Sequence, residues 1–273
     1  MKIPFTKAHG AKNDFLFTWR QDAPDPAASD HAAVARAICD RHTGIGADGW
    51  MLVDPPCDAD AEGTIELYNS DGSIAEMSGN GTRCAAAFLI RHGHAAGVVR
   101  VRTGAGVKSV RLLKRRALGF EFEMNMGRPE LTAASFQLEL PWGPRDVTLL
   151  RVGNPQCAVP VEHFDFDWRA LGAEIERHPH FPNRTNVSFV KAVDEHTIEV
   201  RFWERGAGET MSSGTGSTGA AAMAAARGWV SSPVCVLTPA GPIALRFEDL
   251  RFDGDVYLTG PAEIIAEGEF FFE

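Results

Sequence analysis

The sequence contains one short pattern twice. Residues 78–87 read SGNGTRCAAA and residues 213–222 read SGTGSTGAAA, so a serine and glycines precede a run of alanines in both copies. An alternating, β-branched segment comes before each copy, TIEL at 64–67 and TIEV at 197–200, and such segments are typical of strands. A polar loop then joins each segment to its glycine-rich turn. Because the repeat unit covers about half of the chain, it predicts two similar lobes rather than a solenoid.

The match extends upstream, although more loosely. HGAKNDFLFT (9–18) has a counterpart in GNPQCAVPVE (153–162), where a turn with an asparagine is followed by a strand. HTGIGADGWMLVD (42–54) stands opposite FPNRTNVSFVKAV (181–193). We therefore expect an α/β chain of the α+β kind, with two pseudo-symmetric lobes made mostly of short strands and one long central helix each.

The expected domains follow from this alignment. The N-terminal lobe is predicted to span 1–118, with a C-terminal strand, 263–273, as a candidate for its completion. The C-terminal lobe is predicted to span 119–262, and MGRPE (126–130) is the expected linker.

Composition excludes several classes of function. The 273 residues carry a formal net charge of -9, and an acidic chain is poorly suited to bind nucleic acid or anionic membranes. Apolar stretches stay well short of the roughly 20 residues that span a bilayer, and the N-terminus lacks the pattern of a signal peptide. The five cysteines are scattered without a CxxC pair, so neither a disulfide framework nor a metal site is predicted. We expect a cytoplasmic protein.

The repeated turn is suited to bind an anion. A helix is predicted to begin after Ser78 and another after Ser213, with glycines at 93 and 228 ending them. The first N–H groups of a helix lack partners within it, and together with the helix dipole they attract negative charge. Two such helices, one from each lobe, are suited to hold a small carboxylate-bearing molecule in the cleft between the lobes.

Two other motif interpretations are weaker. Residues 214–219 fit the GxGxxG pattern of dinucleotide-binding proteins, but no carboxylate lies about 20 residues further on, where the ribose would be bound. Serine hydrolase chemistry lacks both a suitably placed histidine and the GxSxG turn. A dinucleotide-dependent enzyme is therefore kept only as the least favoured alternative.

The longer motifs identify a family that the chain resembles, diaminopimelate epimerase. The motifs are HGAKNDF (9–15), RHTGIGADG (41–49), YNSDGSIAEMSGNGTRC (68–84), GNPQ (153–156), FPNRTNVSFV (181–190), ERGAGETMSSGTG (204–216) and LTGPA (258–262). The resemblance covers essentially the whole chain. It implies two pseudo-symmetric lobes, each a mostly antiparallel sheet wrapped around a central helix, with the active site in the interlobe cleft. It also implies an isomerase that converts LL- to meso-diaminopimelate without any cofactor or metal, as a homodimer.

The family uses two cysteines as catalytic bases, and they match Ser78 and Ser213 here. A thiol has an ordinary pKa of about 8.5 and can ionise at a helix N-terminus, whereas a hydroxyl needs a separate base. The sequence shows no such base beside either serine. Three interpretations stay open: a natural variant with altered chemistry, a protein whose cysteines were replaced to trap substrate, and a binding protein without catalysis. Gln156 stands where the family usually has a histidine, and this second departure favours a natural divergent lineage.

The remaining site residues are carried over from the family motifs. The resemblance implies catalytic roles for Ser78, Ser213, Glu204 and Gln156. Glu204 and Arg205 match the pair that engages the distal ammonium and carboxylate of the substrate. The residues expected to contact substrate are Asn13, Gly49, Asn69, Gly79, Asn80, Asn154, Asn186, Glu204, Arg205, Gly214 and Thr215. A related amino-acid racemase and a silent binding protein of the same fold are the alternative functions.

Overall fold

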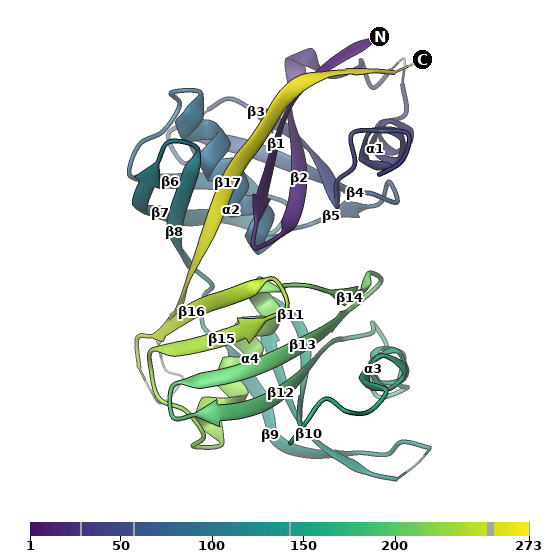
Figure 1. Ribbon diagram of the computed structural model, residues 1–273, viewed down its shortest axis with the longest axis vertical. Coiled ribbons are helices and arrows are strands. Elements are labelled where there is room, and N and C mark those ends of the chain that lie inside the picture. Colours follow the sequence, from purple (N-terminus) through teal and green to yellow (C-terminus); the bar gives the residue numbers. More distant parts are fainter. Residues whose placement is uncertain (28, 57, 142, 250–253, 273) are drawn as a thin grey trace. The chain divides into compact units, whose positions relative to one another are not determined.

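The chain forms two compact units. The computed structural model describes residues 1–27, 29–56, 58–141, 143–249 and 254–272 (Figure 1). The first unit combines Met1–Met124 with the segment that begins at Gly260, and the second unit is Asn125–Thr259. Both are built mostly of strands with few helices, which confirms the expected mixed α+β class. The predicted domain limits at 118/119 and 262/263 stay a prediction about folding units, and the last residue of the predicted strand 263–273 lies outside the described residues.

The first unit surrounds one long helix with strands. Its helices are α1 (His31–Cys39), α2 (Gly79–Arg91) and the short 3-10 helix η1 (Arg20–Asp22). Its strands are β1 (Lys2–Gly10), β2 (Asn13–Trp19), β3 (Gly49–Asp54), β4 (Gly63–Asn69), β5 (Ile74–Ala75), β6 (Val98–Thr103), β7 (Gly106–Arg116), β8 (Gly119–Asn125) and the later part of β17 (Val256–Phe271).

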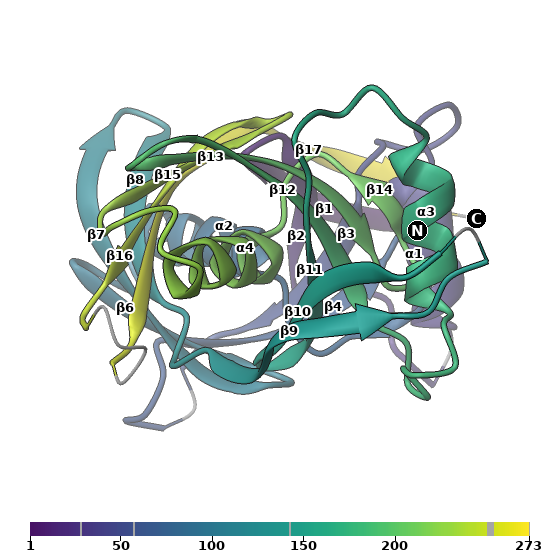
Figure 2. The same cartoon turned by 90° about the horizontal axis from the view of Figure 1, so that it is seen from below.

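The second unit has the corresponding elements. Its helices are α3 (Trp168–Glu176) and α4 (Gly214–Ala226). Its strands are β9 (Glu130–Leu138), β10 (Arg145–Val152), β11 (Asn154–Pro160), β12 (Asn186–Asp194), β13 (Thr197–Glu204), β14 (Gly208–Thr210), β15 (Val234–Thr238), β16 (Gly241–Phe247) and the beginning of β17. Figure 2 shows the strands of this unit around α4, with α3 on their outer side.

The strand pairings repeat element by element. In the first unit β1–β2 is antiparallel, β2–β3 parallel, β3–β4 antiparallel, β4–β6 parallel and β6–β7 antiparallel. In the second unit β10–β11, β11–β12, β12–β13, β13–β15 and β15–β16 follow the same sequence of directions. In the first unit β17 pairs with both β1 and β8 and so closes the ring of strands. The internal repeat predicted from the sequence is therefore confirmed.

Both central helices are buried, and the side chains of α4 are nearly all small. In α4 every residue from Gly214 to Ala224 is buried, and alanines of this helix pack against Leu150, Val200 and Leu245 of the surrounding strands. A helix without a polar face belongs in the interior of a protein. α2 is also buried from Gly79 to Ile90, although its second half carries the larger side chains of Phe88, Leu89 and Ile90. The small side chains of α4 let the surrounding strands approach that helix closely.

Candidate active site

Ser78 caps the helix α2. Its backbone is extended (φ -128°, ψ 123°), and its Oγ accepts a hydrogen bond from the Gly81 N–H at 3.1 Å. The next N–H, of Thr82, donates to the Ser78 carbonyl at 2.8 Å. The N–H groups of Gly79 and Asn80 precede these capped groups, at the positive end of the helix dipole. The predicted helix start is confirmed, as is the glycine after its end, since Gly93 has a φ of 79°.

Ser213 caps α4 with the same geometry and one additional contact. Its φ and ψ are -135° and 124°, and its Oγ accepts from the Gly216 N–H at 3.1 Å. The same hydroxyl donates to Glu204 Oε1 at 2.7 Å. Gly216 has no space for a side chain, because a Cβ there would lie 2.9 Å from both Ser213 Oγ and the Phe202 ring. The glycine therefore keeps the hydroxyl accessible to both partners.

Glu204 is a candidate base beside Ser213 that the sequence alone did not reveal. It ends β13, and burial of its carboxyl raises its pKa, although the hydrogen bond from Ser213 acts in the opposite direction. The expectation that no base stands beside Ser213 was therefore wrong. It failed because strand β13 and the turn before α4 meet in space while they are separated by a loop in the sequence.

The first unit lacks this carboxylate. Asn69 ends β4 as Glu204 ends β13, but its Nδ2 donates to Ser73 Oγ at 3.0 Å. Among the described residues no side-chain carboxylate hydrogen-bonds to the Ser78 hydroxyl. The two serines thus share a backbone geometry but differ in their chemical surroundings.

A second group of polar side chains lies beside the start of α4. Gln156 is buried, and its Nε2 donates to Asn154 Oδ1 at 2.6 Å. The Asn154 Nδ2 in turn donates to Thr215 Oγ1 at 3.5 Å, in the first turn of α4. Within the described part of the chain the Gln156 Oε1 has no hydrogen-bond partner. A buried amide oxygen without a partner can accept a hydrogen bond from a ligand.

Asn186 and Arg205 form a further contact in the second unit. Asn186 Oδ1 accepts from the Arg205 backbone N–H at 2.9 Å, and its Nδ2 donates to the Pro155 carbonyl at 3.2 Å. Arg205 is exposed, and its guanidinium donates to the Asn183 carbonyl at 3.2 Å. None of the ion pairs among described residues includes Arg205. Its charge is therefore available to an acidic ligand.

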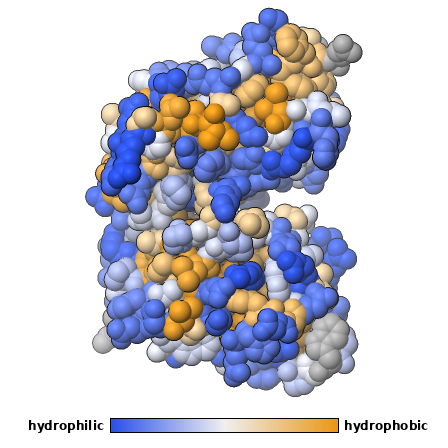
Figure 3. Space-filling view, viewed as in Figure 1, coloured by the Kyte–Doolittle hydropathy of each residue, from blue (hydrophilic) through white to orange (hydrophobic). Residues whose placement is uncertain are grey.

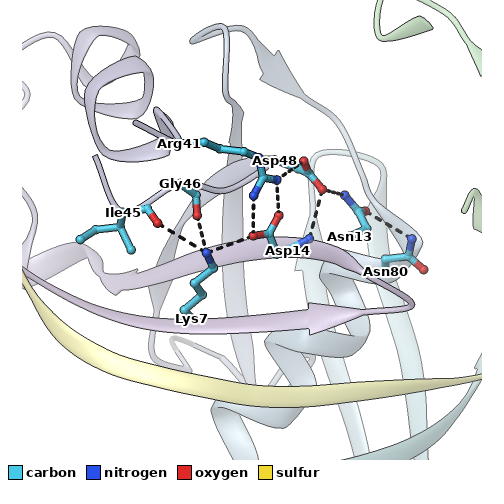
Figure 4. Close-up of polar contacts among 8 residues, drawn as sticks. All are labelled: Lys7, Asn13, Asp14, Arg41, Ile45, Gly46, Asp48 and Asn80. Atoms are coloured by element: carbon cyan, nitrogen blue, oxygen red, sulfur yellow. Dashed lines mark hydrogen bonds and ion pairs between the residues drawn. The ribbon is translucent and has the colours of Figure 1, made fainter. Parts of the chain in front are cut away.

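Two candidate residues of the first unit, Asn13 and Asn80, belong to a network with charged side chains (Figure 4). Asn13 Nδ2 donates to Asp48 Oδ2 at 2.5 Å, and Asn80 Nδ2 donates to Asn13 Oδ1 at 3.3 Å. Arg41 holds Asp48 Oδ1 at 2.8 Å and also pairs with Asp14. Arg41 and Asp48 lie in the motif RHTGIGADG, but their roles could not be predicted, because nothing in the motif shows that they lie near Asn13.

Gly49 begins β3 beside this network. A Cβ at this position would lie 2.8 Å from Leu67 Cδ1 and 2.9 Å from the Tyr68 carbonyl, so packing alone requires glycine here. Its predicted contact with substrate, like the other predicted catalytic and binding roles, stays a prediction. In the described ranges no group of histidine, cysteine or acidic side chains is arranged to hold a metal ion. No helix there has the length and apolar character needed to cross a membrane.

Solved structures share this architecture. A probable proline racemase from Agrobacterium radiobacter matches with a TM-score of 0.76 and 16% identity, over 99% of this chain and 93% of the other. A predicted epimerase from Pseudomonas aeruginosa matches with a TM-score of 0.70 and 16% identity, over 99% and 100% of the two chains. At such low identity these matches show the fold alone, which is the two-lobed fold found in these racemase and epimerase structures.

Sequence comparisons identify the family within this class. The family described as Diaminopimelate epimerase matches residues 5–132 and 148–265. A diaminopimelate epimerase of Pelotomaculum thermopropionicum is 37% identical, over 97% of this chain and 98% of the relative. One from Pseudomonas fluorescens is 35% identical, over 98% and 99%. The chain belongs to the diaminopimelate epimerase family, and the predicted resemblance is confirmed.

Proposed function

We propose that this chain is an isomerase that epimerises diaminopimelate, interconverting the LL and meso forms. The observation that supports this most directly is the Ser213–Glu204 pair at the start of a buried helix, in a chain that matches the family along nearly its whole length. The repeated cap at Ser78 supplies the second candidate base.

The surroundings of Ser213 suit proton abstraction. As a bond forms between Ser213 Oγ and the α-proton of the substrate, the proton of the hydroxyl passes to Glu204 Oε1, and the electron pair stays on the α-carbon. Burial raises the pKa of this carboxyl, which makes it a stronger base than an exposed carboxylate. Ser78 delivers its hydroxyl proton to the α-carbon from the other face and is left as an alkoxide that accepts from the Gly81 N–H. Because a hydroxyl is a much weaker acid than a thiol, the serine form is expected to turn over slowly.

Both ends of the substrate are proposed to be bound by hydrogen-bonding and charged groups of the site. The α-carboxylate is proposed to accept hydrogen bonds from backbone N–H groups at the two helix starts. These are the N–H groups of Gly79, Asn80, Gly214 and Thr215. The exposed guanidinium of Arg205 takes the distal carboxylate. The buried Gln156 Oε1 accepts from a substrate ammonium, a role for which an amide oxygen serves as well as a neutral imidazole nitrogen. The rest of the proposed substrate site is lined by Gly49 and by the side chains of Asn13, Asn69, Asn154 and Asn186.

A homodimer and a cytoplasmic location are the finer parts of this proposal. Exposed apolar side chains on β17, Ile265 and Phe271, support association, and Figure 3 shows apolar patches among hydrophilic side chains on one face of the molecule. Light scattering should give twice the chain mass of 29.6 kDa. A related amino-acid racemase and a silent binding protein remain the alternatives, the latter favoured by serine at both base positions.

Calorimetry with diaminopimelate tests the proposal. The parent should bind it, and Arg205→Lys should weaken that binding by about tenfold because a bidentate carboxylate contact is lost. Binding of a monoamino monocarboxylic acid should change much less. Arg201→Lys is the matched control, since Arg201 lies on β13 and already pairs with Glu199 at 2.7 Å. Absence of diaminopimelate binding by the parent would overturn the proposal.

A further inference from the structure

Arg83 is a buried cation at the start of α2. Its side chain is fully buried, and burial lowers its pKa to about 10, so it still carries its charge at neutral pH. The guanidinium donates to Asn80 Oδ1 at 2.5 Å, to the Gly79 carbonyl at 3.3 Å and to the Pro261 carbonyl at 3.3 Å. Within the described ranges no carboxylate forms an ion pair with it. Its contacts thus go to neutral oxygens beside the proposed substrate site.

The space around Arg83 is shaped for this contact. A Cβ at Gly260 would lie 3.0 Å from the guanidinium carbon, and one at Gly10 would lie 3.2 Å from the Asn80 and Pro261 carbonyls. Glycine at both positions therefore lets the guanidinium reach between α2 and β17. This gives a physical reason for the LTGPA motif, which the proposed function leaves unused.

Arg83 determines which way the Asn80 amide faces. A guanidinium can only donate hydrogen bonds, so the oxygen of Asn80 must face it and the Nδ2 must face away. That Nδ2 then donates to Asn13 Oδ1. With the amide reversed, N–H groups of Asn80 and Arg83 would confront each other in a buried position, which is costly.

Asp48 determines the orientation of the Asn13 amide, and it does so as an acceptor, whereas Arg83 acts on Asn80 as a donor. A carboxylate can only accept, so Asn13 must present its Nδ2 to Asp48 and its oxygen to Asn80 (Figure 4). The hydrogen bonds from Arg83 through Asn80 and Asn13 to Asp48 therefore all run in one direction. Each of the two amides keeps a second Nδ2 hydrogen that this chain of contacts does not use.

The repeat provides an internal comparison. Thr218 occupies in α4 the position that Arg83 occupies in α2, and both side chains donate to the carbonyl four residues earlier, Gly214 or Gly79. The threonine accounts for that local contact without any charge. The guanidinium of Arg83 is therefore not needed for that local contact, and its additional contacts are those with Asn80 Oδ1 and the Pro261 carbonyl.

We propose that Arg83 and Asp48 are positioning residues that hold the Asn13–Asn80 amide pair in one orientation, so that its remaining N–H groups serve as donors to a carboxylate of diaminopimelate. The inference rests on the proposed function for the identity of the ligand, whereas the orientation of the amides is independent of it. The amides already have this orientation in the ligand-free protein, so binding does not include the free-energy cost of reorienting them.

The test combines nuclear magnetic resonance with calorimetry. Asparagine is labelled with ¹⁵N, and the Nδ2 signals of Asn13 and Asn80 are assigned in the ligand-free parent by their loss in single alanine variants. Asp48→Asn removes the obligatory acceptor, and Arg83→Met removes the obligatory donor. Both variants should shift the Nδ2 signals of both asparagines and weaken diaminopimelate binding about tenfold, as expected for a lost hydrogen bond to a charged group.

Matched variants separate positioning from stability. Asp14→Asn removes an equal charge that also pairs with Arg41. Among the described residues no hydrogen bond joins the Asp14 side chain to either amide, so the signals and affinity should stay near those of the parent. Arg83→Lys keeps a cationic donor and should retain most of the affinity.

Unshifted signals in Asp48→Asn, or an equal change in Asp14→Asn, would overturn the proposal. If the parent binds no diaminopimelate, the proposed function fails, and the amide signals still decide the orientation. If Arg83→Met does not fold, Asp48→Asn and Arg83→Lys decide.

Discussion

At the scale of single residues, the two serines are chemically unequal although their caps are alike. Ser213 donates to a carboxyl whose pKa is raised by burial, whereas Ser78 has no acidic partner among the described residues. Because the two caps have different partners, we expect the two halves of the proposed reaction to differ in rate. Variants of Ser78 and of Ser213, made one at a time, can measure this difference as a rate of α-proton exchange.

Replacement of the serines by cysteine should restore proton exchange. Ser78→Cys with Ser213→Cys should raise exchange of the substrate α-proton by about 10²–10⁴-fold per restored acid–base group. Ser213→Cys alone should exceed Ser78→Cys alone, because only position 213 has Glu204 as its neighbour. Proton NMR of diaminopimelate in deuterated buffer measures this. Ser212→Cys is the control thiol, and equal stimulation by it, or fast exchange by the parent, would mean that the bases are assigned wrongly.

Glu204→Gln should change how stability depends on pH. Because burial raises the pKa of Glu204, the folded state holds this proton more tightly than the unfolded state does. Its stabilising contribution is therefore present at low pH and is lost as the pH rises from about 4.3 through the raised value. The Gln variant lacks that loss, so its stability relative to the parent should increase over this interval. Urea unfolding at a series of pH values tests this, with the exposed Glu195→Gln as control.

At the scale of elements, the sequence predicted individual strands and helices better than the contacts between distant segments. The strands at 64–67 and 197–200 and the helices after Ser78 and Ser213 follow from local patterns and are confirmed by β4, β13, α2 and α4. Capping and alternation act over a few residues, so they are visible in one dimension. The Ser213–Glu204 contact and the Arg83–Asn80–Asn13–Asp48 chain depend on contacts between distant segments. Single-sequence patterns do not encode those contacts, and both features were therefore missed. The sheet around each central helix was expected only from the family resemblance.

The two helix caps should differ in their effect on stability. Ser78→Ala should cost about 1 kcal/mol of unfolding free energy through the lost cap. Ser213→Ala should cost about 1–3 kcal/mol more, because the half-buried Glu204 loses its donor as well. Denaturant unfolding gives both values. Ser212→Ala provides the reference, since its buried hydroxyl has no partner among the described residues, and equal losses at 78 and 213 would contradict the prediction.

At the scale of the whole molecule, one strand serves both units. Val256–Thr259 of β17 pairs with β16 in the second unit. From Glu263 to Phe271 the same strand pairs with β1, from His9 to Lys2. The first unit is therefore closed by a segment that follows the entire second unit in the sequence.

Truncation after Thr259 should separate the stabilities of the two units. The first unit would lose the partner of β1 and β8 and also the Pro261 carbonyl that receives Arg83, whereas β16 would keep its partner. Amides of α2 should lose protection against hydrogen exchange while those of α4 retain it. A chain ending at Phe271, which keeps all of β17, serves as the control. Equal loss of protection in both helices would show that the units do not fold separately.

The shared strand also reverses the order in which the units can be completed during translation. Residues 1–124 leave the ribosome first, but β1 and β8 then lack the strand that joins them and present unpaired edges. The segment 125–259 already contains the pairings of its own unit when it emerges. The half of the chain that is made first is thus completed last, and we expect its unpaired strand edges to favour aggregation until β17 has been synthesised.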